Sequence, residues 1–95
     1  MTVNEKLQTL YDLAVMEVTE NILPWWMTYA VDEENGGFYG EVDNDNKPVA
    51  HAPKFITLNA RLIWTFASAY RVLGDEKYRK MADRAYDYFV QHFWD

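Results

Sequence analysis

The sequence predicts an all-α protein in which a buried helix is paired with an amphipathic one. The segment 53–73 has a helical period of apolar residues and carries a single charge, Arg61, between residues 55 and 70. The segment from Glu76 to about Phe93 has one apolar and one charged face, and the turn between the two segments is so short that they must run antiparallel. A further helix is expected from Thr2 to about Tyr29, with a short β-like loop between it and the pair.

The first helix is expected to begin at a capping box. Thr2 and Glu5 have the S/T-x-x-E spacing in which each side chain accepts a hydrogen bond from the other residue's backbone N–H. Apolar residues then recur at three- and four-residue steps, which predicts one buried face. They are Leu7, Leu10, Tyr11, Ala14, Val18, Ile22 and Trp25. Pro24 lacks an amide hydrogen and crowds the carbonyl of Glu20, so the helix should kink or stop near residues 21–23.

The connection 31–52 is irregular and rich in turn residues. Its pattern predicts a turn at 35–37, a short strand over Phe38–Val42 and a second turn. Two acidic clusters raise a calcium hypothesis, but counting from Asp43 the sixth residue is proline and the twelfth is lysine, where a calcium loop has glycine and glutamate. We interpret these acids as turn formers and predict neither a metal site nor a cofactor. The clusters are Asp32-Glu33-Glu34 and Asp43-x-Asp45.

The second and third helices have recognisable ends. Pro53 suits the first position of a helix, and Gly74 is the usual residue after a helix C-terminus. Asp75 can cap the third helix directly. The apolar arc of the second helix is wide enough to predict full enclosure, whereas the third helix should be half exposed, so an inner helix is paired with an outer one. The apolar face of the third helix comprises Tyr78, Met81, Ala82, Ala85, Phe89 and Phe93.

Composition and charge exclude several classes of function. The net charge of −6 at pH 7, with scattered basic residues, argues against binding to nucleic acid or to an anionic membrane. The chain has no cysteine, no secretion signal and no apolar run of membrane-spanning length, which favours a cytoplasmic location. A hydrophobic content of 49% and an aromatic content of 17% exceed what three helices can hide. We therefore expect a homo-oligomer, joined through exposed apolar helix faces, or a longer protein.

Arg61 is the first candidate functional residue. On a nearly uncharged helix, an arginine must pair, bind an anionic or oxygen-rich ligand, or face water. It belongs to a polar stripe with Thr57, Thr65 and Ser68, flanked by Trp64. The stripe is either a solvated surface or a ligand-binding face. Exposed arginines are far commoner than functional ones, which favours the solvated surface, whereas the neighbouring tryptophan and the lack of an acidic partner on the helix point to the ligand-binding face.

Three more polar residues are candidates for a functional role. Asn59 points away from Arg61 into the apolar arc, which suits either a neighbour of a ligand pocket or a buried structural hydrogen bond. His51 and His92 have side chains suited to proton transfer at neutral pH. However, His51 has no neighbouring carboxylate in the sequence, and His92 lies on or beside an apolar helix face. Packing or surface roles are therefore favoured for both histidines.

Three segments together resemble the N-acylglucosamine 2-epimerase family, especially its cellobiose 2-epimerase branch. They are ENILPWWMTYAVDEENGGFYGEVDNDN, LNARLIWTFASAYRVLGDEKY and MADRAYDYFVQHFWD. The resemblance implies that residues 1–95 are a single domain, the N-terminal fragment of an (α/α)6 barrel. It also implies C2 epimerisation of a reducing-end aldose, such as cellobiose, N-acylglucosamine or mannose, through a cis-enediolate. Related members instead isomerise aldoses to ketoses.

The resemblance also implies roles for individual residues. Arg61 matches the arginine of the family's x-A-R-x-x-W motif and would stabilise the enediolate, with Thr57 and Asn59 as neighbours in the substrate pocket. The acid and base of the family are histidines on later inner helices, and His51 and His92 do not match them. We therefore expect a mono- or disaccharide as the partner of the full-length enzyme and no activity from this chain alone.

Two other classes of function remain as alternatives. The chain can be a stand-alone helical module for self-association or protein interaction, in which case it should give one defined stoichiometry. A barrel segment should instead self-associate without a fixed stoichiometry or be partly molten. A different (α/α)6 enzyme, such as a glycoside hydrolase, is disfavoured because the predicted inner helix carries no pair of carboxylates.

Overall fold

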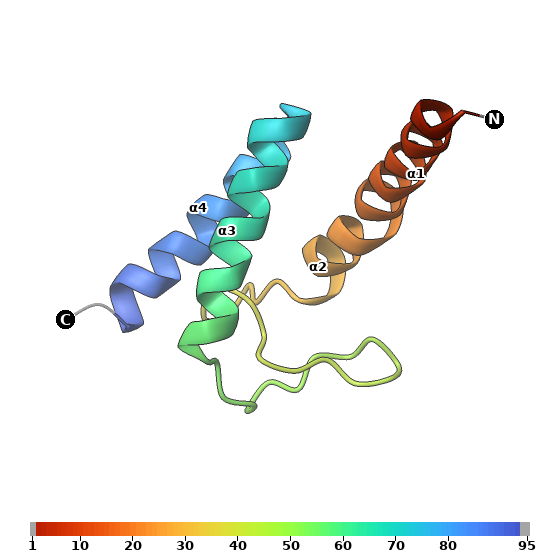
Figure 1. Cartoon of the computed structure of the whole chain (residues 1–95). Helices are drawn as coiled ribbons and strands as arrows, with labels where there is room; N and C mark the ends of the chain where they lie inside the picture. Colours follow the sequence, from red (N-terminus) through yellow and green to blue (C-terminus); the bar gives the residue numbers. More distant parts are fainter. Residues whose placement is uncertain (1, 94–95) are drawn as a thin grey trace.

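The structure, a computed structural model, describes residues 2–93, and the named secondary-structure elements of this part are all helices. The helical elements are α1 (Val3–Glu17), the π-helix η1 (Val18–Ile22), α2 (Leu23–Tyr29), α3 (Ile56–Leu73) and α4 (Glu76–His92). The first three follow one another as one long rod, and α3 packs against α4 as a hairpin (Figure 1). The predicted all-α class is confirmed.

The rod begins and ends as the sequence predicts. Thr2 Oγ1 accepts a hydrogen bond from the Glu5 N–H at 3.1 Å, and the Thr2 N–H donates to Glu5 Oε2 at the same distance, which completes the capping box. The backbone widens into η1 directly before Pro24, where the Leu23 N–H donates to the Val18 carbonyl five residues back. This π-turn accommodates the proline, so the helix continues to Tyr29 instead of stopping.

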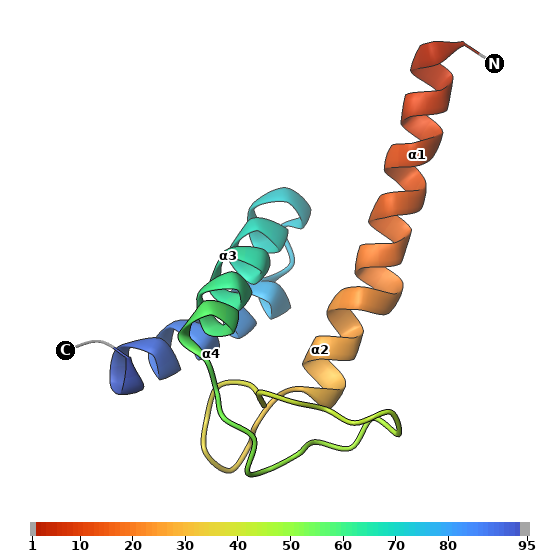
Figure 2. The same cartoon turned by 60° about the horizontal axis from the view of Figure 1, so that its bottom comes forward.

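The predicted buried face of the first helix is not buried in this chain. No residue of α1 is buried, and Leu7, Leu10 and Tyr11 are all more than half exposed. The reason is the position of the rod, which stands apart from the α3–α4 hairpin over most of α1 (Figure 2). An apolar groove of about 290 Å³ is left between the rod and α3, lined by residues that include Val18 and Val72.

The core lies where α3, α4 and the connection 31–52 meet. Phe66 of α3 is fully buried and stacks on Phe38 of the connection, with ring centroids 5.7 Å apart. The remaining buried apolar residues come from the rod end, α3 and α4, so one core joins the rod end to the hairpin. They are Leu23, Ala30, Leu62, Tyr78, Ala82 and Ala85.

The ends of α3 correct one prediction and confirm two. The helix starts at Ile56, so Pro53 lies before it and not at its first position. Residue 53 passes close to Gly40, where a Cβ atom would clash with the Pro53 carbonyl oxygen. At the other end, Gly74 takes a left-handed conformation with φ +77°, and Asp75 Oδ1 accepts a hydrogen bond from the Lys77 N–H at 3.0 Å, as predicted.

Two further predictions about this region are wrong. The helix α3 is not enclosed within the described chain: Asn59, Leu62 and Phe66 are buried, whereas the opposite side is open. The expected strand over 38–42 is absent from residues 2–93, which instead contain two isolated bridges, between residues 31 and 38 and between residues 42 and 48. Close approach of Gly40 to the segment before α3 and a tight turn after residue 42 interrupt the ladder.

Candidate functional site

The exposed face of α3 carries the predicted functional arginine. Arg61 is exposed and has no hydrogen bond or ion pair with any residue between 2 and 93. Thr57 lies one turn earlier on the same face, and Trp64 lies one turn later. With neighbouring side chains they line an open groove of about 580 Å³. Its lining residues are Ile56, Thr57, Ala60, Arg61, Trp64 and Phe89.

Asn59 lies on the opposite side of α3, facing α4. Its side chain is 6% exposed, and its Nδ2 donates a hydrogen bond to the Ala85 carbonyl at 2.9 Å. The amide therefore joins the two helices of the hairpin, which is the structural role considered for it from the sequence. Thr57 and Arg61 are brought together in the structure, whereas Asn59 is separated from them by the width of the helix.

Neither histidine lies in the groove beside Arg61. His51 is exposed in the connection before α3. His92 ends α4, and its ring lies against the Tyr88 ring with centroids 4.2 Å apart. This contact agrees with the packing role predicted for His92.

Among residues 2–93, no cluster of three or more His, Cys, Asp or Glu side chains is arranged to hold a metal ion.

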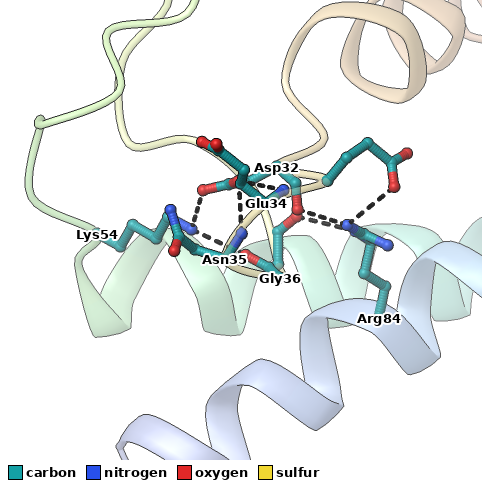
Figure 3. Close-up of polar contacts among 8 residues, drawn as sticks. Asp32, Glu34, Asn35, Gly36, Lys54 and Arg84 are labelled. Carbon is teal, nitrogen blue, oxygen red and sulfur yellow. Dashed lines mark hydrogen bonds and ion pairs between the residues drawn. The ribbon is translucent and has the colours of Figure 1, made fainter.

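A second polar cluster centres on the buried carboxylate of Asp32 (Figure 3). Its Oδ1 accepts hydrogen bonds from the backbone N–H groups of Glu34 and Asn35, at 3.0 and 2.9 Å. Its Oδ2 lies 2.6 Å from Nζ of Lys54, and that ammonium also donates to the Gly36 carbonyl at 2.8 Å. The predicted turn-forming role of Asp32 is thus confirmed, whereas its ion pair with Lys54 was not predicted.

Arg84 holds the same turn from the side of α4. Its Nη2 donates to the Asp32 carbonyl at 2.6 Å, and its Nε donates to the Gly37 carbonyl at 3.0 Å. The guanidinium also lies 3.7 Å from the exposed carboxylate of Glu33. The turn is therefore fixed to α4 by Arg84 and to the segment before α3 by Lys54 (Figure 3).

The charges of this cluster change the acidity of Asp32. Burial raises the pKa of its carboxyl group, but the hydrogen bond from Lys54 and the two backbone N–H donors lower it by more. The net pKa lies below 3.8, the ordinary value of an aspartate. A buried carboxylate that is ionised at neutral pH, with both oxygens hydrogen-bonded inside the fold, suits an anchor for the turn.

An inner helix backed by an outer helix, with a cation on its free face, is the arrangement expected for the wall of an (α/α)6 barrel. Comparison with known families agrees with this class, because the model of the family described as N-acylglucosamine 2-epimerase matches residues 37–95. The chain belongs to the N-acylglucosamine 2-epimerase family. The resemblance inferred from the sequence is confirmed.

Individual relatives are also similar over most of the chain. The cellobiose 2-epimerase of Bacteroides fragilis is 49% identical over 79 residues, which are 83% of this chain and 20% of that protein. The cellobiose 2-epimerase of Eubacterium cellulosolvens is 37% identical over 84 residues, or 88% of this chain and 20% of the relative. The chain thus spans about a fifth of the length of these curated relatives.

One solved structure supports the fold directly. The cellobiose 2-epimerase from Bacillus thermoamylovorans B4167 matches with a TM-score of 0.86 and 36% identity, covering 93% of this chain and 22% of that chain. The helical architecture is therefore that of part of an (α/α)6 barrel enzyme, as the sequence predicts.

Within residues 2–93, no helix is both long and apolar enough to cross a membrane.

Proposed function

We propose that this chain forms the N-terminal segment of a carbohydrate 2-epimerase. The enzyme would invert C2 of a reducing-end aldose, such as cellobiose, N-acylglucosamine or mannose, by ring opening, removal of the C2 proton and reprotonation of a cis-enediolate on the other face. Family membership supports the reaction class. The observation that carries the proposal is the unpartnered guanidinium of Arg61 in an open groove on the inner helix.

In this proposal Arg61 stabilises the enediolate. Removing a proton from the carbon next to a carbonyl places negative charge on two neighbouring sugar oxygens. A guanidinium presents N–H donors in a fixed plane and keeps its charge at any working pH, so it can bind both oxygens as that charge develops. The lack of an acidic partner among residues 2–93 leaves these donors available to the substrate.

Thr57 and Asn59 would support Arg61 in different ways. The Thr57 hydroxyl lies one turn away on the same groove and can hydrogen-bond a sugar hydroxyl. Asn59 would act indirectly, because its hydrogen bond to the Ala85 carbonyl fixes α3 on α4 and thereby fixes the direction of the exposed face. The groove lining contains no acid–base side chain, so the proton carriers would belong to another part of the enzyme. We therefore expect the chain alone to be inactive.

A chimeric enzyme tests this proposal. In the Bacteroides fragilis cellobiose 2-epimerase, the matched 79-residue stretch is replaced by the corresponding residues of this chain. We expect the chimera to epimerise cellobiose, with exchange of the C2 hydrogen visible by NMR in D₂O. Because Lys cannot reproduce the planar pair of donors, Arg61→Lys should lower kcat by roughly 100-fold or more.

Arg71→Lys provides the matched control for Arg61→Lys. Arg71 is an exposed arginine in the last turn of the same helix and does not line the groove. Its substitution should leave kcat and KM within about twofold. A folded chimera without activity would contradict the proposed function. Full activity of Arg61→Lys would contradict the role given to Arg61.

The exposed apolar surface supports a second candidate function. Leu10 and Tyr11 of α1 are 63% and 57% exposed, and they belong to an apolar stripe that no other described element covers. Such a stripe suits self-association of the chain or docking onto a protein partner. We keep this interaction module as the alternative to the epimerase segment.

A further inference from the structure

Trp64 is an exposed aromatic residue on the open side of α3. Its side chain is 72% exposed, although Phe66, two residues later, is fully buried. Trp25 and Trp26 behave differently, since they are partly buried and contact each other with ring centroids 5.2 Å apart. Trp64 has no aromatic or cation–π partner within residues 2–93. The largest side chain of α3 therefore points away from the core.

The position of Trp64 relative to the proposed site is fixed by the helix. At about 100° per residue, Thr57, Arg61 and Trp64 fall within an arc of about 60°. The buried side chains of α3, at positions 59, 62 and 66, lie on the opposite side. All three exposed residues line the same groove, so the indole, the guanidinium and the hydroxyl face the same space.

The chemistry of this face selects one class of ligand. A purely apolar partner, such as another helix, would desolvate Arg61 without offering it an acceptor, which costs free energy. A nucleic acid is disfavoured by the net charge of −6. A disaccharide suits both side chains, because the C–H face of its closed ring packs on an indole, while the hydroxyl oxygens of its reducing-end unit and the carbonyl oxygen that ring opening creates accept hydrogen bonds from the guanidinium.

We propose that Trp64 is a substrate-binding residue on which a sugar ring stacks while Arg61 holds the reacting oxygens. This inference rests on the proposed epimerase function and names the residue that positions the sugar in the groove. The stacking contact is the same before and during enediolate formation, because the stacked ring is the non-reducing ring of a disaccharide, which stays closed while the reducing-end aldose opens and reacts. It therefore contributes to substrate binding and not to the chemical step.

Kinetics of the chimera test the inference. Trp64→Ala should raise KM for cellobiose roughly tenfold and leave kcat within about twofold, whereas Trp64→Phe, which keeps an aromatic face, should restore most of the affinity. Arg61→Lys should give the reverse pattern, with the loss mainly in kcat. Melting temperatures of the variants, measured by circular dichroism, should stay close to that of the unsubstituted chimera if Trp64 acts on the substrate.

The outcomes separate this inference from the proposed function. An inactive unsubstituted chimera would overturn both. An active chimera in which Trp64→Ala leaves KM unchanged would overturn the role of Trp64 alone. A Trp64→Ala variant that loses thermal stability, with kcat and KM both impaired and no rescue by phenylalanine, would also overturn it, because that pattern indicates a packing residue.

Discussion

At the scale of single residues, the buried pair of Asp32 and Lys54 is the most sensitive polar contact of the fold. Asp32 is fully buried, and Lys54 Nζ lies 2.6 Å from its Oδ2. Replacing one partner of a buried pair leaves the other charge uncompensated, which costs about 3 kcal/mol. We therefore expect Asp32→Asn to lower the free energy of unfolding of the chain by about 3 kcal/mol. Urea unfolding followed by circular dichroism measures this change.

Asp83→Asn is the matched control, because it also removes one charge from an ion pair. Asp83 pairs with Arg79 at 4.0 Å on the surface of α4, where both side chains are well exposed. Exposed ion pairs contribute little to stability, so Asp83→Asn should lower the free energy of unfolding by less than about 0.5 kcal/mol. Equal decreases in the free energy of unfolding for Asp32→Asn and Asp83→Asn would contradict the prediction that a buried ion pair contributes more than an exposed one.

The same carboxylate predicts a pH dependence of stability. The pKa of Asp32 in the folded protein lies below its ordinary value, because the hydrogen bonds from Lys54 and the backbone outweigh the effect of burial. Its stabilising effect is therefore complete above about pH 4, where the unfolded carboxyl is also ionised, and is lost as the pH falls through the folded pKa. The urea midpoints of unfolding of Asp32→Asn and of the unmodified chain should converge at pH values below the folded pKa of Asp32. A constant difference down to the most acidic conditions would contradict the prediction.

Sequence reasoning finds half of this cluster. Asp32 stands directly before glutamate and asparagine-glycine residues, and that local pattern correctly predicts a turn former. Its partner Lys54 is 22 residues away, and Arg84 of α4 is 52 residues away, so no periodicity connects them. Arg61 is found because it is the single charge between residues 55 and 70 of a long helical pattern, which makes it conspicuous. Trp64 is noticed only as its neighbour, since exposure cannot be told from a helical pattern whose other faces are also apolar.

At the scale of elements, the turn around Gly37 joins the connection to α4. Gly37 has φ +66°, and a Cβ atom there would lie 2.7 Å from Cγ of Tyr88. Gly74, which ends α3, has φ +77° but open space around the same atom. We expect Gly74→Ala to lower the free energy of unfolding by about 1 kcal/mol, because alanine disfavours the left-handed backbone conformation. Gly37→Ala should lower it by about 2–4 kcal/mol, because the new methyl group also overpacks against Tyr88. Thermal unfolding followed by circular dichroism measures the stability of both variants. An equal loss of stability in the two would contradict the prediction, because it would show that Tyr88 moves aside freely.

Element ends were predictable where a single residue type determines them. The capping box at Thr2, the left-handed Gly74 and the cap at Asp75 are local patterns, and all three are confirmed. The predictions for Pro53 and for the segment 38–42 are wrong, and the two segments approach each other closely at Gly40 and Pro53. Helix propensity contains no information about such contacts between distant segments.

At the scale of the whole molecule, the fold class was predictable and the burial of its faces was not. The wide apolar arc of α3 and the half-polar α4 correctly indicated an inner helix backed by an outer one. An apolar stripe shows that a face is suited to burial, but it does not say which chain covers it. The faces of α1 and α3 are open among the described residues for this reason. The cytoplasmic location and the homo-oligomer stay predictions.

The open apolar stripe of α1 predicts that the chain associates with itself. Leu10 is 63% exposed on this stripe, and burying such side chains between copies removes apolar surface from water. Sedimentation velocity should show a sedimentation coefficient that rises with concentration. Leu10→Glu should suppress the rise, whereas Gln8→Glu, which adds the same charge on the polar face of α1, should not. A chain that stays monomeric at all concentrations would contradict the prediction. One defined stoichiometry would favour the interaction module, whereas a broad distribution would favour a segment whose faces fit other helices of an epimerase barrel.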